Sequence, residues 1–143
     1  SGDICAIAKL TDVHTGTREF ADAADAKRKM RTWVGSEPRF HPHVALHDFE
    51  AWLLPYWSTI QQIAGSNRKS PGLNPEIIDH DRPPSKVLAD VFLKGTSERT
   101  YSKIRDAQAI LRGQDLAVAA AACPELRAFL NTILTLSEGE PLP

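Results

Sequence analysis

Apolar residues form strand-like runs and then helical spacing in the first third of the chain. Two short apolar runs, at 4–10 and 40–46, are typical of buried strands. Between them, apolar residues three or four positions apart predict a helix over 21–33, with a charged outer face. A strand, a helix and a second strand within the first 46 residues predict a βαβ unit with parallel strands and a right-handed crossover.

Helical patterns dominate the rest of the chain. The predicted helices cover 49–54, 56–64, a start at 74–76, 85–93, 100–111, 116–122 and 124–136. The segment 79–83 contains Pro83 and interrupts this series. The sequence therefore predicts an α/β fold over 1–143, a single but partial domain with an α/β core over 1–54 and a helical part over 55–137.

Two parallel strands are too few for a stable sheet. Parallel strands need neighbours within the sheet and cover on both faces. We therefore expect further strands to be supplied by an N-terminal segment, by a second copy of the chain or by another protein.

The composition is that of one compact soluble domain. Of the 143 residues, 42% are hydrophobic and the formal net charge is −1, which argues against a basic nucleic-acid surface over the whole chain. No apolar run reaches the length of a membrane span, and no signal peptide is visible. Cys5 and Cys123 are expected to be buried free thiols in a reducing compartment, which predicts a cytoplasmic protein. We expect the three tryptophans in the core: Trp33, Trp52 and Trp57.

Titratable side chains follow both predicted strands. Asp12 follows the first strand, and His47, Asp48 and Glu50 follow the second. Because parallel strands end at the same edge of a sheet, Asp12, Asp48 and Glu50 are predicted to share a Mg²⁺ or Mn²⁺ ion, with His47 as a further catalytic residue. Each carboxylate also has a structural interpretation. Asp12 can be a turn residue, Asp48 a helix cap, and Glu50 a complement to the helix dipole.

A second candidate site lies in the helical part. Ser85 and Lys86 begin a predicted helix, where backbone amides, a hydroxyl and an ammonium group can hold a phosphate. Lys103 can add a further phosphate contact. The structural alternative is a plain N-cap at Ser85 followed by a surface lysine.

Four blocks of the sequence resemble one protein family. The run Leu46-His47-Asp48-Phe49-Glu50-Ala51 resembles the signature of an uncharacterised family of bacterial proteins with a Toprim-like fold. Three further blocks resemble that family in the same order: Pro84-Ser85-Lys86, Tyr101-Ser102-Lys103, and Cys123-Pro124-Glu125-Leu126-Arg127-Ala128-Phe129-Leu130. The resemblance covers residues 4–135 approximately.

The resemblance implies a metal-dependent nuclease acting on DNA or RNA, as the effector of an anti-phage defence system with an ATPase partner. Toprim sites combine an acidic residue on a first strand with an Asp-x-Asp motif on a later one. Here Asp12-Val13-His14 stands in place of Asp-x-Asp, and the family's preceding segment with the first acid is not contained in this sequence. These departures favour the alternative, a non-catalytic protein-interaction domain with a degenerate Toprim fold.

Overall fold

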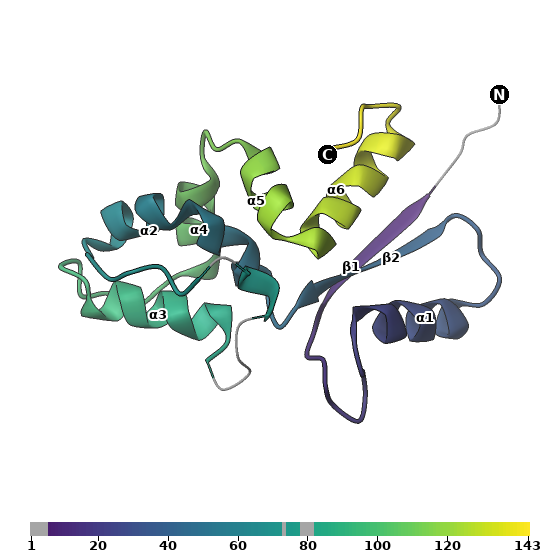
Figure 1. The fold of residues 1–143 in the computed structure, drawn as a ribbon, viewed down its shortest axis with the longest axis horizontal. Coiled ribbons are helices and arrows are strands. Elements are labelled where there is room, and N and C mark those ends of the chain that lie inside the picture. The colour runs from purple at the N-terminus through teal and green to yellow at the C-terminus, as the bar shows by residue number, and fades with distance from the viewer. Residues whose placement is uncertain (1–5, 73, 78–81) are drawn as a thin grey trace.

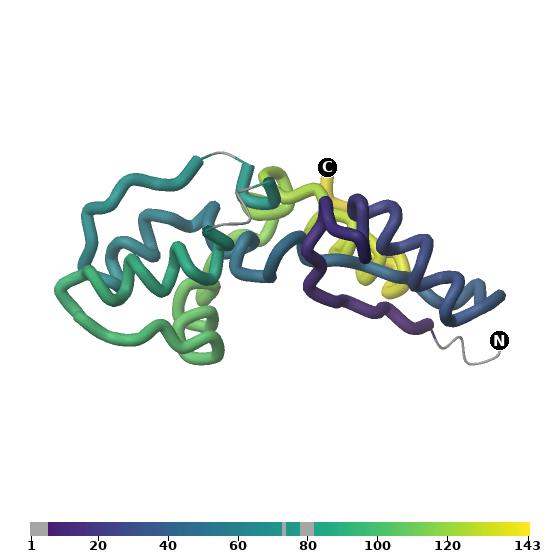
Figure 2. Tube along the Cα trace, turned by 90° about the horizontal axis from the view of Figure 1, so that it is seen from below, coloured from purple at the N-terminus to yellow at the C-terminus, as the bar shows by residue number. Residues whose placement is uncertain are grey.

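The computed structural model describes residues 6–72, 74–77 and 82–143. Strand β1 (Ile7–Val13) pairs in parallel with β2 (Phe40–Leu46), and helix α1 (Ala23–Val34) connects them, so the α/β class and the βαβ unit are confirmed. The elements that follow are the 3₁₀ helix η1 (Phe49–Tyr56), α2 (Trp57–Ala64), the 3₁₀ turn η2 (Pro75–Ile77), α3 (Pro84–Lys94), α4 (Lys103–Leu111), α5 (Leu116–Ala122) and α6 (Pro124–Leu136). Figures 1 and 2 show α2, α3 and α4 gathered at one end of the molecule, away from the strands.

Strand β1 extends further towards the C-terminus than the pattern of apolar side chains predicted. The predicted strand ended at Leu10, whereas β1 continues to Val13 in register with Leu46 of β2. Asp12 therefore lies within the strand, opposite Ala45, and not after it. Backbone pairing with β2 decides this end, because an edge strand tolerates polar side chains on its exposed positions. The predicted start at 4–5, with Cys5, lies outside the described residues.

Helices cover both faces of the two-stranded sheet. On one face α1 buries Ala26 and Met30 against Val13 and Val44. On the other face lies α6, where the ring of His43 packs edge-on against Phe129 at a centroid distance of 5.4 Å. Figure 1 shows α1 and α6 on opposite sides of the strands. Although α6 belongs to the predicted helical part, it completes the layer that buries β2.

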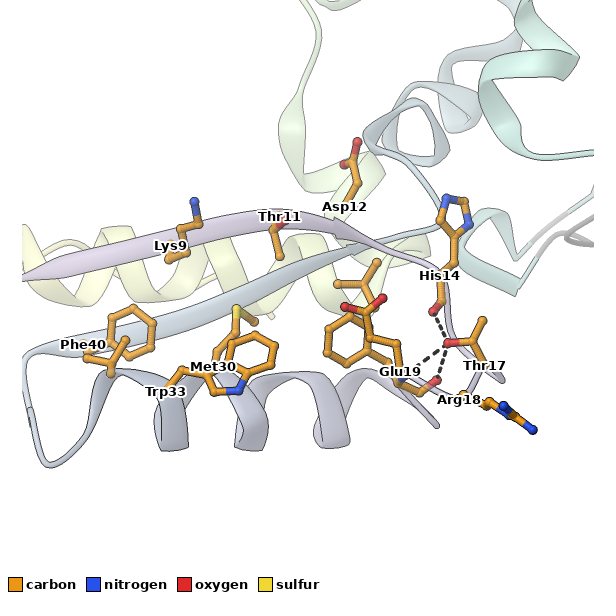
Figure 3. A pocket seen from close by; sticks show the side chains of 13 residues that line it. Lys9, Thr11, Asp12, His14, Thr17, Arg18, Glu19, Met30, Trp33 and Phe40 are labelled. Atoms are coloured by element: carbon orange, nitrogen blue, oxygen red, sulfur yellow. Dashed lines mark hydrogen bonds between the residues drawn. The ribbon is translucent and has the colours of Figure 1, made fainter.

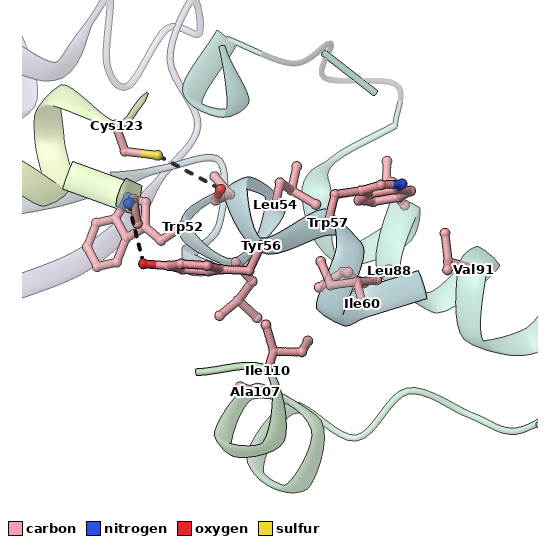
Figure 4. Close-up of a cluster of buried hydrophobic side chains, with 14 of the residues drawn as sticks. Trp52, Leu54, Tyr56, Trp57, Ile60, Leu88, Val91, Ala107, Ile110 and Cys123 are labelled. Carbon is pink, nitrogen blue, oxygen red and sulfur yellow. Dashed lines mark hydrogen bonds between the residues drawn. The ribbon is translucent and has the colours of Figure 1, made fainter. Parts of the chain in front are cut away.

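The larger core lies among η1 and the helices that surround it. Leu53, Ile60, Leu88, Phe92 and Ile110 are fully buried there. Figure 4 shows this cluster converging on η1 and α2. Two of the three tryptophans, Trp52 and Trp57, are buried as predicted, whereas Trp33 is 66% exposed, so the prediction that it lies in the core was wrong.

Several helix ends differ from the sequence pattern. The predicted helix at 49–54 is a 3₁₀ helix that contains Pro55 and runs into α2. Helix α3 begins at Pro84 with Pro83 in the cap position, so the prediction that Ser85 caps this helix was wrong. Helix α4 begins at Lys103, because the carboxylate of Asp106 accepts a hydrogen bond from the Ser102 N–H at 2.6 Å and fixes the first turn there.

The other helical predictions agree with the structure or fall partly outside it. Both α5 and α6 have the predicted bounds. The predicted helix start at 74–76 is the short turn η2, and most of the predicted break at 79–83 lies outside the described residues. None of the helices in the described part of the chain combines the length and apolarity needed to cross a bilayer.

Candidate functional site

The site begins at the turn that ends β2. The N–H of His47 donates to the carbonyl of Val13 at 2.8 Å, one residue beyond the strand pair. His47 then adopts a left-handed backbone conformation, with φ of +69°. Such a conformation is uncommon for a residue with a side chain and is found repeatedly at functional sites. The buried ring of His47 lies 6.0 Å from that of His14, measured between centroids.

Asp48 follows this turn and contacts the start of α3. Its side chain is 9% exposed, and its Oδ2 atom accepts a hydrogen bond from the Ser85 N–H at 3.3 Å. Its Oδ1 atom accepts no hydrogen bond from the described residues. Asp48 occupies the cap position of η1 but makes no cap bond there. The capping interpretation thus applies to α3, a helix that begins 36 residues later in the chain.

Glu50 is the most deeply buried carboxylate of this site, with an exposure of 2%. The Tyr101 hydroxyl donates to its Oε1 atom at 3.3 Å, and the ammonium of Lys103 lies 3.8 Å from Oε2. Burial raises the pKa of Glu50, and the nearby charge of Asp48 adds to this shift, whereas Lys103 opposes it. Within the described chain, Oε2 accepts no hydrogen bond.

Tyr101 and Lys103 complete the wall around Glu50. Burial and the Glu50 carboxylate raise the pKa of Tyr101, so its hydroxyl remains a donor at neutral pH. The ammonium of Lys103 also lies 4.8 Å from the ring centroid of Phe49, which is cation–π geometry. Lys103 is exposed and can therefore reach a ligand in solvent.

The structure brings together some of the predicted site residues and separates others. Asp48, Glu50, Ser85 and Lys103 meet at the junction of η1, α3 and α4. Asp12 is exposed, and Figure 3 shows it on the face of β1 opposite Met30 and Trp33 of α1. In the described ranges no group of three or more His, Cys, Asp or Glu side chains is arranged to hold a metal ion. The three-ligand set of Asp12, Asp48 and Glu50 is thus not assembled.

The predicted phosphate site is altered by Asp48. The Ser85 amide, which was expected to face a phosphate, donates to the Asp48 carboxylate. Ser85 is half-buried and Lys86 is exposed in the first turn of α3. Lys86 and Lys103 are both exposed, in the first turns of α3 and α4, while the Ser85 amide is already used by Asp48.

Sequence reasoning missed Glu76, a carboxylate that is buried at the start of α6. Its Oε1 atom accepts from the Trp52 indole N–H at 3.1 Å, and both oxygens accept from the Glu125 N–H at 3.2 Å. Helices α3 and α6 both begin at a proline and have no side-chain cap of their own, so Asp48 and Glu76 supply the acceptors. The available signal was that Pro83 and Cys123 are poor N-caps.

A second missed residue is Asp106, which is 1% exposed in α4. Arg99 donates to both of its oxygens, at 2.8 and 2.7 Å. Burial alone raises the pKa of Asp106, but the hydrogen bonds from Arg99 and from the Ser102 N–H lower it further than burial raises it. The sequence spacing of Arg99 and Asp106 did not indicate this ion pair, because Arg99 lies in a loop and Asp106 lies in helix α4. This carboxylate is fully satisfied, and we assign it to structure.

Comparison with other proteins places the chain in a family. No match was found among curated proteins or among solved structures. A family described as a domain of unknown function, DUF4276, matches residues 3–134, a range that contains all four sequence blocks. Three of these blocks meet around Asp48 and Glu50, and Cys123 of the fourth contacts the carbonyl of Ala51 at 4.0 Å. The chain belongs to the DUF4276 family.

Proposed function

We propose that this domain is a metal-dependent nuclease of Toprim-like type that hydrolyses phosphodiester bonds. The observation that carries this proposal is the buried pair of Asp48 and Glu50. Each carboxylate has one oxygen that accepts no hydrogen bond in the described part of the chain. Buried carboxylates usually have their oxygens satisfied, so an oxygen that accepts no hydrogen bond has a lone pair available to a ligand. The pair also follows the carboxyl end of a parallel strand, where α/β folds place their ligands.

The residues present fit a hard divalent cation. Mg²⁺ is commonly held by one or two carboxylates, with waters and substrate phosphates completing its shell. Asp48 and Glu50 would hold Mg²⁺ or Mn²⁺ in this way, and Asp12 is not required as a third ligand. Such an ion supplies Lewis acidity to a phosphate group.

The remaining side chains have separate tasks. Lys103 and Lys86 attract the phosphate backbone of a nucleic acid to the two helix starts. Tyr101 fixes the Glu50 carboxylate through its hydroxyl. His14 is exposed, and its ring lies 6.0 Å from that of the buried His47, measured between centroids.

The substrate class and the partner rest on the sequence resemblance. The four blocks support DNA or RNA as substrate, a role in the defence of a bacterial cytoplasm against phage, and an ATPase as the companion protein. The alternative is a non-catalytic interaction domain. A specific observation favours it: Asp12 is exposed within β1, so the ligand set is limited to two carboxylates.

Metal binding is the first test. Calorimetry should detect weak Mn²⁺ binding by the wild type, because two ligands seldom dehydrate a cation fully. Asp48→Asn and Glu50→Gln should each weaken it by about tenfold or more, since each removes a charged ligand. Glu140→Gln, at an exposed position, is the matched control and should bind like the wild type. Equal affinities in all four proteins would reject the site.

Cleavage and stability of one variant separate enzyme from interaction domain. Glu50→Gln should abolish Mn²⁺-dependent cutting of nucleic acid while leaving the melting temperature unchanged or higher. The reason is that burial disfavours an ionised carboxylate at this position, whereas an amide carries no charge. If Glu50 were instead a structural residue, the substitution would lower stability by about 0.5–2 kcal/mol. Lost stability, together with no cutting by the wild type, would favour the interaction domain.

A further inference from the structure

Two buried carboxylates of this chain lie beside a cation, and the two contacts differ in kind. Arg99 donates to both oxygens of Asp106, at 2.8 and 2.7 Å. The Lys103 ammonium lies 3.8 Å from Oε2 of Glu50, which is beyond the distance of about 2.7–2.9 Å for a charge-assisted hydrogen bond. Lys103 therefore offsets the charge of Glu50 without occupying the lone pairs of this oxygen.

The backbone at Lys103 is fixed, whereas its ammonium can move. Lys103 is the first residue of α4, and the N–H of the preceding Ser102 donates to Asp106 at 2.6 Å. The side chain of Lys103 is 56% exposed, and its ammonium lies 4.8 Å from the ring centroid of Phe49. A lysine ammonium is carried by a flexible four-carbon stem. It can therefore leave Glu50 while α4 keeps its place.

Glu50 needs a nearby positive charge both with and without a metal ion. The residue is 2% exposed, and burying an unpaired ionised carboxylate is costly. In the structure this positive charge comes from Lys103. A divalent cation would bind a carboxylate oxygen at about 2.0–2.1 Å and would repel an ammonium that stayed about 4 Å from the same oxygen. The metal ion and Lys103 thus compete for Oε2.

We propose that Lys103 is an exchangeable counter-ion of Glu50, which leaves Oε2 for solvent when Mg²⁺ or Mn²⁺ binds there. This inference rests on the proposed metal site at Asp48 and Glu50, and it names the residue that regulates how readily the site fills. Lys103 weakens metal binding because the incoming cation must displace it. The released ammonium is exposed, so it becomes available to a phosphate group at the moment when the metal ion is bound.

Mn²⁺ affinity measured by calorimetry tests the competition. Lys103→Met keeps a long unbranched side chain and removes the charge, so it should bind Mn²⁺ about tenfold more tightly than the wild type. Lys103→Arg retains the charge and should bind Mn²⁺ no more tightly than the wild type. Lys94→Met removes the same charge from an exposed position at the other end of α3, and it should bind like the wild type.

The outcomes of this titration separate the inference from the proposed site. Mn²⁺ binding by the wild type, with equal or weaker binding by Lys103→Met, would overturn the exchange and leave the metal site in place. An equal gain of affinity in Lys94→Met would also overturn the exchange, because net charge would then explain the effect. A lack of Mn²⁺ binding by all of these proteins would reject the metal site together with the exchange.

Melting temperatures in EDTA and in saturating Mn²⁺ provide a second test. In EDTA, Lys103→Met should melt below the wild type, because Glu50 has lost its counter-ion. In saturating Mn²⁺ this difference should vanish or reverse, because the bound metal ion supplies the charge. Arg99→Met is the matched control, and its deficit should persist in Mn²⁺ because no metal ion replaces the guanidinium at Asp106. A Lys103→Met deficit of equal size in both solutions, or no deficit in EDTA, would overturn the proposal.

Discussion

Glu76→Ala is expected to lower the free energy of unfolding by about 3 kcal/mol or more, because each buried donor left without an acceptor costs about 1–3 kcal/mol. The substitution removes the acceptor of the Trp52 indole N–H and of the Glu125 and Leu126 backbone N–H groups. Glu76 itself is only 5% exposed, so water cannot readily replace it. The melting temperature should fall by about 10 °C for a chain of this size.

Two variants control this prediction. Glu76→Gln keeps one acceptor oxygen in place and should lose less stability than Glu76→Ala. Glu140→Ala removes an exposed carboxylate from the same chain and should melt within error of the wild type. If Glu76→Ala and Glu140→Ala melted alike, Glu76 would not be the acceptor that holds η2 to α6.

Arg99→Met is expected to cost about 3 kcal/mol, because it leaves the buried Asp106 carboxylate without its charge partner. This expected loss of stability is at the lower end of the range for breaking a buried ion pair, because the Ser102 N–H and Arg105 still contact Asp106. The pKa of Asp106 is lowered from its ordinary value of 3.8, so its contribution is complete above that pH and is lost as the pH falls through the folded pKa. The penalty should therefore be largest at pH 7 and shrink as the pH falls below 3.8.

A surface ion pair provides the matched control for Arg99→Met. Arg82 contacts Asp90 at 2.5 Å, and both side chains are largely or partly exposed. Arg82→Met should cost less than about 1 kcal/mol. The double variant Arg99→Met, Asp106→Leu should recover part of the loss, because replacing a whole buried pair by apolar groups is often neutral. A double variant as unstable as Arg99→Met alone would show that the penalty does not come from the stranded carboxylate.

The buried carboxylates of this chain fall into two kinds. Glu76 and Asp106 accept hydrogen bonds on both oxygens and connect segments of the fold. Asp48 and Glu50, after the end of β2, each have one oxygen that accepts no hydrogen bond from the described residues, although the Lys103 ammonium lies 3.8 Å from that oxygen of Glu50. Burying a carboxylate oxygen without a hydrogen bond is costly. This contrast, and not burial alone, is the reason for placing the candidate metal site at Asp48 and Glu50.

The sequence by itself determined the secondary structure wherever one dominant local signal existed. The apolar run at 40–46 specified β2, and Pro124 at a first helical position specified the start of α6. It also directed attention to Asp48 and Glu50, because carboxylates directly after a strand lie at a predictable edge. These features depend on residues near each other in the chain, so their physical causes are visible in the sequence.

Only the tertiary structure decided what those carboxylates contact. Asp48 caps a helix that starts far along the chain, and Glu50 meets Tyr101 and Lys103 of a third segment. The same holds for Asp12, which lies inside a strand because β1 pairs with β2 as far as Val13. It also holds for Trp33, whose helical spacing fits a core position although no helix or strand in the described part of the chain covers it. Hydrogen bonds and burial between distant segments depend on how the elements pack, and the local pattern of residues does not encode that packing.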